Sequence, residues 1–368
     1  TVASMNPAPS QGNQGSHGGA VDPNGMEHNG LNPNGLNPNA GAVDTGGFRI
    51  HDSGSIPAVG VMSRRIGTSD LRVHPVALGA NVFGWSVDDG AARRILDAFV
   101  DGGGTLVDTA DSYASGRSET MIGSWIAARG NRDRVVISTK VGKSAENPGL
   151  SAKAISAAVH ESLQRLRVDT IDLLFLHIDD TTVEFDETLA AVDRLIRGGA
   201  VRAFGGSDHT GNRLIQARIA CAMLGVAPMV ALQNQYSLMH RGQFESDLAH
   251  VAEHQQLGVL PRFPLAAGYL TGKYRTRSDI VASRRSGEVS KHFGRRGQRV
   301  ISVLDEVAKS HEVAPATVAL AWLLTKPNIV APIASATSVE QVTAMLAAPR
   351  IQLTRSQVTE LDRASSGR

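Results

Sequence analysis

Short β-branched apolar runs alternate with longer stretches of helical period from about residue 64 onward. Candidate strands begin near Val76, Thr105, Val135, Asp172, Val201, Met229, Gly258 and Ile329. By subtraction, successive starts lie 29, 30, 37, 29, 28, 29 and 71 residues apart. Between them, apolar residues recur three or four positions apart, as over 91–100, 152–166 and 189–197, which predicts amphipathic helices.

Eight such β-α units within about 290 residues fit a closed (β/α)₈ barrel, an α/β fold, better than two mononucleotide-binding halves. We predict that residues 61–368 form this barrel as a single domain. The long last interval predicts an extra loop, which the basic segment 275–299 supplies. That loop has two interpretations: a solvated surface loop, or a flap over a phosphorylated ligand at the face where barrel enzymes hold phosphates.

Residues 1–60 have a different composition. They are rich in Gly, Asn, Pro and Ser and contain a near-repeat that starts at Leu31 and again at Leu36. A segment with so little apolar surface cannot offset the entropy lost on ordering. We therefore predict a disordered N-terminal tail.

Bulk properties narrow the class of protein. A hydrophobic content of 42% permits a sizeable core, and a formal net charge of +2 indicates neither a nucleic-acid nor an anionic-membrane partner. Cys221 is the only cysteine, so there is no internal disulfide or multi-cysteine metal site, and we expect it to be buried on a helix. Because no run of about 18 apolar residues and no secretory leader pattern occurs, we expect a soluble, cytoplasmic protein.

Four polar residues fall at or just beyond successive strand ends. Asp108 ends the second predicted strand, Tyr113 follows it, Lys140 ends the third and His177 ends the fourth. Adjacent strands lie about 4.8 Å apart, so these side chains can converge in one hydrogen-bonded cluster. A buried lysine needs a counter-charge, and Asp108 is available.

Such a cluster suits proton transfer to a carbonyl oxygen. A tyrosine hydroxyl is protonated at neutral pH and can donate, but it needs help to release its proton. A nearby ammonium stabilises the tyrosinate, and a carboxylate holds that ammonium in place. The histidine can bind the substrate oxygen and orient it. In this interpretation Asp108 and Lys140 tune the site and Tyr113 transfers the proton.

Seven segments in order resemble motifs of the aldo-keto reductase superfamily: "GGGTLVDTADSY", "VVISTKVG", "IDLLFLHIDD", "VRAFGGSDHT", "ALQNQYSLMHR", "PLAAGYLTGKY" and "SVEQV". The resemblance covers about residues 64–365 and implies a nicotinamide cofactor held without a Rossmann domain. It implies a catalytic tetrad on Asp108, Tyr113, Lys140 and His177. The branch it is most similar to holds bacterial general-stress and potassium-channel β subunit-like reductases.

The resemblance also implies cofactor contacts. Ser207, Asp208 and Gln233 fall on the nicotinamide carboxamide positions, and the other expected contacts are Arg262, Pro264, Leu265, Ala267, Gly268, Lys273, Ser335, Thr337 and Gln341. Arg262 stands where many relatives stack an aromatic ring, and Asp208 stands where asparagine is common. Met345 replaces a frequent asparagine, and no Arg or Lys lies beside Thr337. A 2′-phosphate prefers a cationic partner, so we expect NADP(H) while NAD(H) stays open.

Trp85 has two interpretations, a wall of the substrate pocket or a rim aromatic packed on its neighbours. Two other motifs are set aside. Tyr269 and Lys273 match a short-chain dehydrogenase pair, but the glycine-rich turn of that class is missing after the first strand. His250 and His254 have the spacing of some zinc proteases, but on a helix remote from the strand ends. We therefore expect no metal.

The sequence thus predicts an oxidoreductase that reduces an aldehyde or ketone with NAD(P)H. The alternative is a cofactor-binding interaction or redox-sensing module with little turnover, like a channel β subunit. The partner we expect is a small carbonyl compound, whose identity is left open together with the oligomeric state.

Overall fold

The computed structural model of the chain describes residues 62–281 and 285–367. The predicted tail over 1–60 lies outside the described residues. Within them, eight parallel strands form one sheet. These strands are β3 Ala77–Gly79, β4 Leu106–Asp108, β5 Val136–Val141, β6 Ile171–Leu176, β7 Val201–Ser207, β8 Ala231–Gln233, β9 Gly258–Val259 and β10 Ile333–Ala334.

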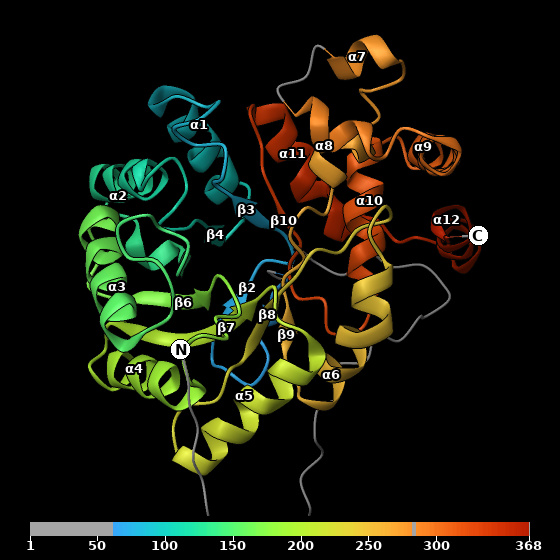
Figure 1. Ribbon diagram of the computed structural model, residues 1–368. Helices are drawn as coiled ribbons and strands as arrows, with labels where there is room; N and C mark the ends of the chain where they lie inside the picture. The colour runs from blue at the N-terminus through green and yellow to red at the C-terminus, as the bar shows by residue number, and fades with distance from the viewer. Residues whose placement is uncertain (1–61, 282–284, 368) are drawn as a thin grey trace, which may run out of the picture. The chain divides into compact units, whose positions relative to one another are not determined.

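The sheet closes on itself. Its order is β10-β3-β4-β5-β6-β7-β8-β9, so each strand pairs with its neighbour in sequence and β10 pairs with β3. Closure comes from a parallel bridge between Val259 and Ile329, and the Ile333 N–H donates to the Pro261 carbonyl at 2.9 Å. Figure 1 shows the strands at the centre with helices outside them. The predicted (β/α)₈ barrel is confirmed.

Helices follow the strands around the barrel. They are α1 Asp89–Asp101, α2 Arg117–Arg129, η1 Arg132–Arg134, α3 Ala152–Leu166, α4 Phe185–Arg197, α5 Gly211–Leu224, η2 Phe244–Leu248, α6 Ala249–His254, η3 Ala266–Thr271, α7 Arg277–Val281, α8 Ser286–Ser290, α9 Arg295–Ser310, α10 Pro315–Leu324, α11 Val339–Ala347, η4 Ala348–Arg350 and α12 Arg355–Ser365. Cys221 is buried on α5, as predicted.

Local signals explain where the predicted helices begin and end. The predicted helix 152–166 is confirmed: the Ser151 side chain accepts a hydrogen bond from Ala154 N, and Arg167 ends the helix in a left-handed conformation. The helix predicted over 189–197 begins earlier, at Phe185. Acidic residues in its first turn stabilise the helix N-terminus. They also interrupt the apolar period, so the pattern does not include this turn.

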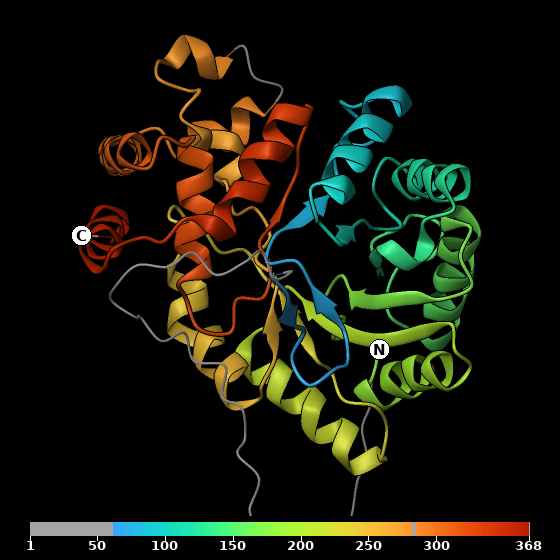
Figure 2. The same cartoon turned by 180° about the vertical axis from the view of Figure 1, so that it is seen from behind.

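A short antiparallel hairpin precedes the barrel. It consists of β1 Arg64–Arg65 and β2 Arg72–Val73. Its buried Ile66 and Leu71 join one apolar cluster with residues of the barrel strands, among them Leu106, Leu173 and Phe175. In Figure 2 the hairpin (blue) lies across the strands. Burying each such side chain contributes about 1.5–3 kcal/mol. The hairpin closes the end of the barrel opposite the polar strand ends, because Arg64 donates to the Ile329 carbonyl before β10 and the His74 N–H donates to Thr105 Oγ1 just before β4.

Two expectations about the last interval need correction. The strand β10 begins at Ile333, later than predicted: Ile329 forms only a single bridge to Val259, because Pro332 has no N–H to continue the ladder between them. The segment 275–299 is not a plain loop, since α7, α8 and the start of α9 occupy much of it. The interval is long because α9 and α10 both lie between β9 and β10.

Candidate active site

Asp108 and Lys140 form a buried ion pair at the carboxyl ends of β4 and β5. The Asp108 Oδ2 atom lies 2.6 Å from Lys140 Nζ, and both side chains are shielded from solvent. Asp108 Oδ1 accepts hydrogen bonds from Ser138 Oγ at 2.7 Å and from Gln233 Nε2 at 3.1 Å. The ammonium also donates to the Thr109 carbonyl at 2.6 Å. Groups on neighbouring strands therefore hold the lysine in one position.

Lys140 carries its charge beside a phenol. Burial alone would lower the pKa of Lys140, because a cation loses hydration inside the barrel. The Asp108 carboxylate and the neighbouring Tyr113 together outweigh burial and raise this pKa above its ordinary value. Lys140 Nζ lies 5.0 Å from the centroid of the Tyr113 ring. A fixed positive charge thus faces the tyrosine.

His177, directly after β6, faces the same phenol. The two rings meet edge to face, with centroids 6.1 Å apart and planes at 81°. Burial first, and then the charges of Lys140, Lys143 and Arg262, lowers the pKa of His177 to about 2. The imidazole is therefore neutral at physiological pH. Its Nδ1 atom has no hydrogen-bond partner among the residues that the structure describes.

Asp111, two residues before Tyr113, is a further titratable group that the sequence pattern does not single out. It is 2% exposed, and neither carboxylate oxygen has a hydrogen-bond partner of regular geometry within the described residues. Burial first, and then the charge of Glu119, raises the pKa of Asp111 to about 6. The nearby amides of Ser112 and Gly142 offset this only in part.

Replacing Asp111 by asparagine should stabilise the protein at neutral pH. An unfolded aspartate ionises near pH 4, whereas the folded pKa is about 6. The native state therefore binds the extra proton between about pH 4 and 6, so stability falls as the pH rises through that window. We expect Asp111→Asn to raise the free energy of unfolding by about 1–3 kcal/mol at pH 7.5, and by less at pH 4.5. Urea unfolding at both pH values measures this, and a loss of stability at pH 7.5 would contradict it.

Hydrogen bonds join the residues at the ends of β7, β8 and β9. Ser207 Oγ donates to the Gln233 carbonyl at 2.9 Å. Asp208 adopts a left-handed backbone with φ 59°, which aspartate tolerates better than most residues. Arg262 Nη2 lies 2.5 Å from Asp208 Oδ1, and Nε lies 3.2 Å from the same oxygen. The guanidinium at the expected stacking position is thus already engaged by a carboxylate.

The segment after β9 bends sharply. Ala266, Ala267 and Gly268 have φ angles of 49°, 55° and 96°, a left-handed run that glycine accommodates most easily. Backbone bent in this way forms a concavity of the kind that binds phosphate groups. Just before the bend, Pro264 is buried and Leu265 packs against the core.

The other predicted cofactor residues follow this bend in the chain. Lys273 is exposed after η3, with Nζ 5.0 Å from the centroid of the Tyr274 ring. After β10, Ser335 Oγ donates to Asn81 Oδ1 at 2.5 Å. The Thr337 N–H donates to Gln341 Oε1 at 2.9 Å. Asn81 was not predicted from sequence, since it follows the first strand without a polar pattern.

A cavity of about 390 Å³ lies beside the bend. It is lined by Asn81, Trp85, Phe263, Ala267, Arg285, Gly287 and Glu288. Trp85 is 51% exposed, and Arg285 Cζ lies 5.6 Å from the centroid of its ring. Arg285 comes from the basic segment that was interpreted as a loop or a flap. The structure therefore places Arg285 of that segment along the same cavity as Ala267, a predicted cofactor residue.

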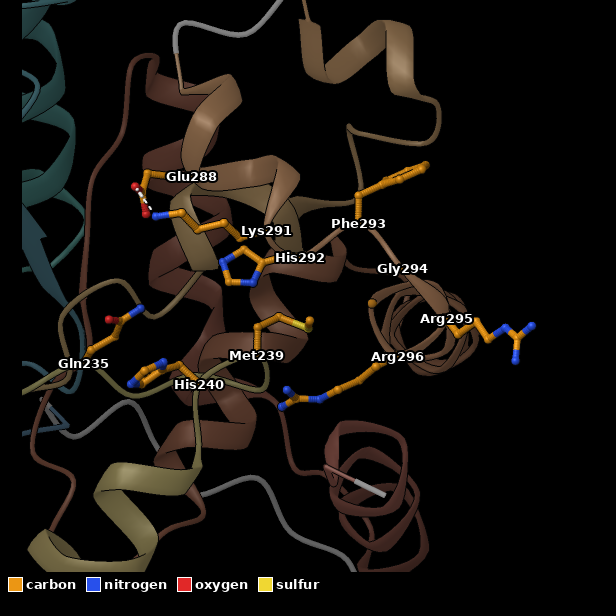
Figure 3. Close-up of a pocket in the computed structure, with 11 residues that line it drawn as sticks. Gln235, Met239, His240, Glu288, Lys291, His292, Phe293, Gly294, Arg295 and Arg296 are labelled. Carbon is orange, nitrogen blue, oxygen red and sulfur yellow. Dashed lines mark hydrogen bonds and ion pairs between the residues drawn. The ribbon is translucent and has the colours of Figure 1, made fainter.

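A larger cavity of about 590 Å³ lies away from the tetrad, between the segment after β8 and the start of α9. In Figure 3, Gln235, Met239, His240 and His292 lie around it, and the side chain of Arg295 points away. None of the four tetrad residues lines it. We place the candidate chemistry at the tetrad because its charges and hydrogen bonds converge there.

Neither a metal site nor a membrane span emerges from the described residues. His250 and His254 lie on α6, where the second histidine Nδ1 is 2.9 Å from the carbonyl oxygen of the first. No group of three or more His, Cys, Asp or Glu in the described ranges is arranged to hold a metal ion. No helix of residues 62–281 or 285–367 is long and apolar enough to cross a membrane.

Comparison with known proteins adds a family context. Residues 75–366 match the model of the aldo/keto reductase family. The chain is 32% identical to the uncharacterised oxidoreductase YrpG of Bacillus subtilis, over 78% of this chain and 91% of that protein. It is 32% identical to a probable voltage-gated potassium channel subunit beta of Oryza sativa, over 76% and 88% of the two chains. An aryl-alcohol dehydrogenase [NADP(+)] of Phanerodontia chrysosporium is 30% identical, over 79% and 82%.

Proposed function

Because the chain belongs to the aldo/keto reductase family, we propose that it reduces an aldehyde or ketone to an alcohol with NAD(P)H and with Tyr113 as the proton donor. The carrying observation is the buried Asp108–Lys140 pair, whose ammonium faces the Tyr113 ring beside a neutral His177. A reduced nicotinamide, when bound, supplies a hydride to the carbonyl carbon.

The side chains have distinct roles in this proposal. Tyr113 donates its proton to the carbonyl oxygen as negative charge develops there. Lys140 stabilises the phenolate that results, and Asp108 holds Lys140 in place. His177, neutral and edge-on to the phenol, binds the carbonyl oxygen and orients it. In the reverse direction the same groups serve alcohol oxidation, since both directions share one transition state.

The residues present fit a nicotinamide dinucleotide. We propose that Ser207, Gln233 and Arg262 hold the nicotinamide end and that the bend at 266–268 receives the phosphates. NADP(H) is the cofactor we favour, because Lys273, exposed after η3, offers a cation for a 2′-phosphate. NAD(H) is the alternative.

Oxidation of NADPH and NADH over a panel of aldehydes, ketones and keto-sugars tests the function. We expect carbonyl-dependent turnover with one cofactor preferred. Cofactor binding without turnover on any member of the panel would contradict the reductase.

The pH dependence of catalysis tests the role of His177. A lowered pKa means that the imidazole stays neutral above about pH 2, so it contributes no ionisation between pH 5.5 and 7.5. We expect His177→Gln to lower kcat/KM by about tenfold, the loss of one positioning hydrogen bond, while leaving the shape of the pH profile unchanged. A limb near pH 6.5 that disappears in the variant would contradict a neutral imidazole.

A second candidate function is a cofactor-binding interaction or redox-sensing module with little turnover. The similarity to potassium channel β subunits and the Arg262–Asp208 pair at the expected stacking position favour it. The intact tetrad favours the enzyme. Tight cofactor binding with negligible turnover would decide for the module.

We further propose that residues 61–368 act as one reductase domain on a small carbonyl compound in the cytoplasm, without a nucleic-acid partner. A single cysteine and a near-balanced charge support this setting.

A further inference from the structure

Three charged side chains form a cluster at the mouth of the barrel, here called the rim cluster. Asp208 Oδ1 lies 2.5 Å from Arg262 Nη2, and its Oδ2 lies 3.4 Å from Lys143 Nζ. All three are partly exposed, with 29–39% of each side chain accessible. Lys143 was not predicted from sequence, because one lysine in a polar loop after a strand carries no signal.

The rim cluster lies just outside the tetrad. The backbone N–H of His177 donates to the Val141 carbonyl at 2.9 Å, and Lys143 comes two residues after Val141 in the chain. Asp208 directly follows β7, and the Arg262 N–H donates to the segment after β8 at 3.0 Å. The charges of Lys143 and Arg262 both act on His177. A substrate that reaches from His177 toward solvent therefore passes the cluster.

The rim cluster has one positive charge in excess. Two cations share the single carboxylate of Asp208. Below it, Lys140 and Asp108 neutralise each other, and His177 is neutral. The balance at the mouth thus favours an anionic group on the ligand.

Other carboxylates of the same face are engaged elsewhere. Asp179 binds Arg213 at 2.8 Å. Asp180 accepts the backbone N–H of Leu150 at 2.9 Å. Glu146 accepts a neighbouring serine hydroxyl at 2.8 Å. None of these three is paired with Lys143 or Arg262 in the part of the chain that the structure describes.

Apolar surface adjoins the cations. Trp85 and Phe263 line the 390 Å³ cavity and are 51% and 38% exposed. The guanidinium of Arg262 lies 5.3 Å from the centroid of the Phe263 ring. Exposed aromatic rings beside a cation suit an apolar or aromatic body that ends in a charged group.

We propose that the substrate is an aldehyde or ketone that carries a carboxylate, an oxo acid, and that Lys143 determines this specificity by binding the carboxylate beside the Arg262–Asp208 pair. The inference rests on the proposed carbonyl reduction. Asp208 holds the two cations at a fixed spacing, and the substrate carboxylate takes up the remaining charge. Lys143 does not contact the reacting atoms.

The test compares 4-formylbenzoate with its methyl ester, two aldehydes of similar shape that differ in charge. We expect the wild type to prefer the anion, and Lys143→Gln to lower the ratio of kcat/KM for anion over ester by about tenfold, the effect of one charge-assisted contact. Lys143→Glu should lower the ratio further, and 0.5 M salt should reduce the wild-type preference. KM for the cofactor should not change.

Lys309→Gln is the matched control, because Lys309 is exposed at the far end of α9. The inference would be overturned if Lys143→Gln left the ratio of kcat/KM for anion over ester unchanged, or if it raised only KM for the cofactor. Either result would leave the proposed reductase activity intact. Absent turnover of both aldehydes would count against the reductase instead. In that case calorimetric titration of 4-formylbenzoate into the cofactor-bound protein decides the carboxylate site: weaker binding by Lys143→Gln supports it, and equal binding overturns it.

Discussion

Replacing Tyr113 by phenylalanine should lower kcat/KM for carbonyl reduction by about a hundredfold to ten-thousandfold, the contribution of a positioned general acid. The substitution removes only the phenol oxygen, so the ring keeps its packing between Lys140 and His177. The proposed cofactor residues lie on other strands, and the dissociation constant for NADPH should therefore stay within about twofold. Steady-state kinetics and quenching of protein fluorescence by NADPH measure the two quantities.

Tyr236→Phe is the matched control. Tyr236 is buried and donates its hydroxyl proton to Glu245 Oε1 at 2.8 Å, away from the tetrad. Its loss should reduce stability by about 1 kcal/mol without a comparable loss of turnover. If Tyr113→Phe turned over carbonyls within a few fold of the wild type, Tyr113 would not be the acid.

Removing the carboxylate of Asp108 should have the largest effect on stability. Lys140 is 1% exposed, and Asp108→Ala would leave its ammonium buried without a counter-charge. Breaking such a pair costs about 3–5 kcal/mol. The change also removes the acceptor of Ser138 Oγ and Gln233 Nε2. Urea unfolding at pH 7 measures the loss.

The double variant Asp108→Ala with Lys140→Met shows how much of the stability loss comes from the unpaired ammonium and how much from lost packing. Once the ammonium is removed as well, much of the stability should return, so the two changes should not be additive. A cost below about 1 kcal/mol for Asp108→Ala alone would mean that the pair is not essential to the fold.

The sequence predicts the barrel well because its signal is local and repeated. Each strand is a short apolar run, and the near-regular spacing identifies the β-α unit without knowledge of contacts. The two errors, the start of the last strand and the structure of residues 275–299, have local causes that the hydrophobic pattern does not show. Pro332 delays β10, and the polar segment 275–299 folds into short helices.

The candidate site was predictable in part. Strand ends at one face of a barrel converge, so Asp108, Lys140 and His177 could be grouped from their positions alone. The rim cluster could not, because the pairing of Asp208 with Arg262 and Lys143 depends on how loops from three strands fold. The burial of Asp111 could not be predicted either, because it depends on how the surrounding loop folds and not on the sequence motif.

In the proposed reaction this barrel delivers hydride from a bound nicotinamide to a carbonyl while Tyr113 donates the proton. The most direct measurement is deuterium transfer: the wild type is incubated with an aldehyde and a reduced nicotinamide cofactor that carries two deuterium atoms at C4, and the alcohol is analysed by mass spectrometry. We expect one deuterium on the former carbonyl carbon and formation of that alcohol at least a hundredfold slower in Tyr113→Phe. Cofactor that binds but yields no deuterated alcohol from any carbonyl would contradict it.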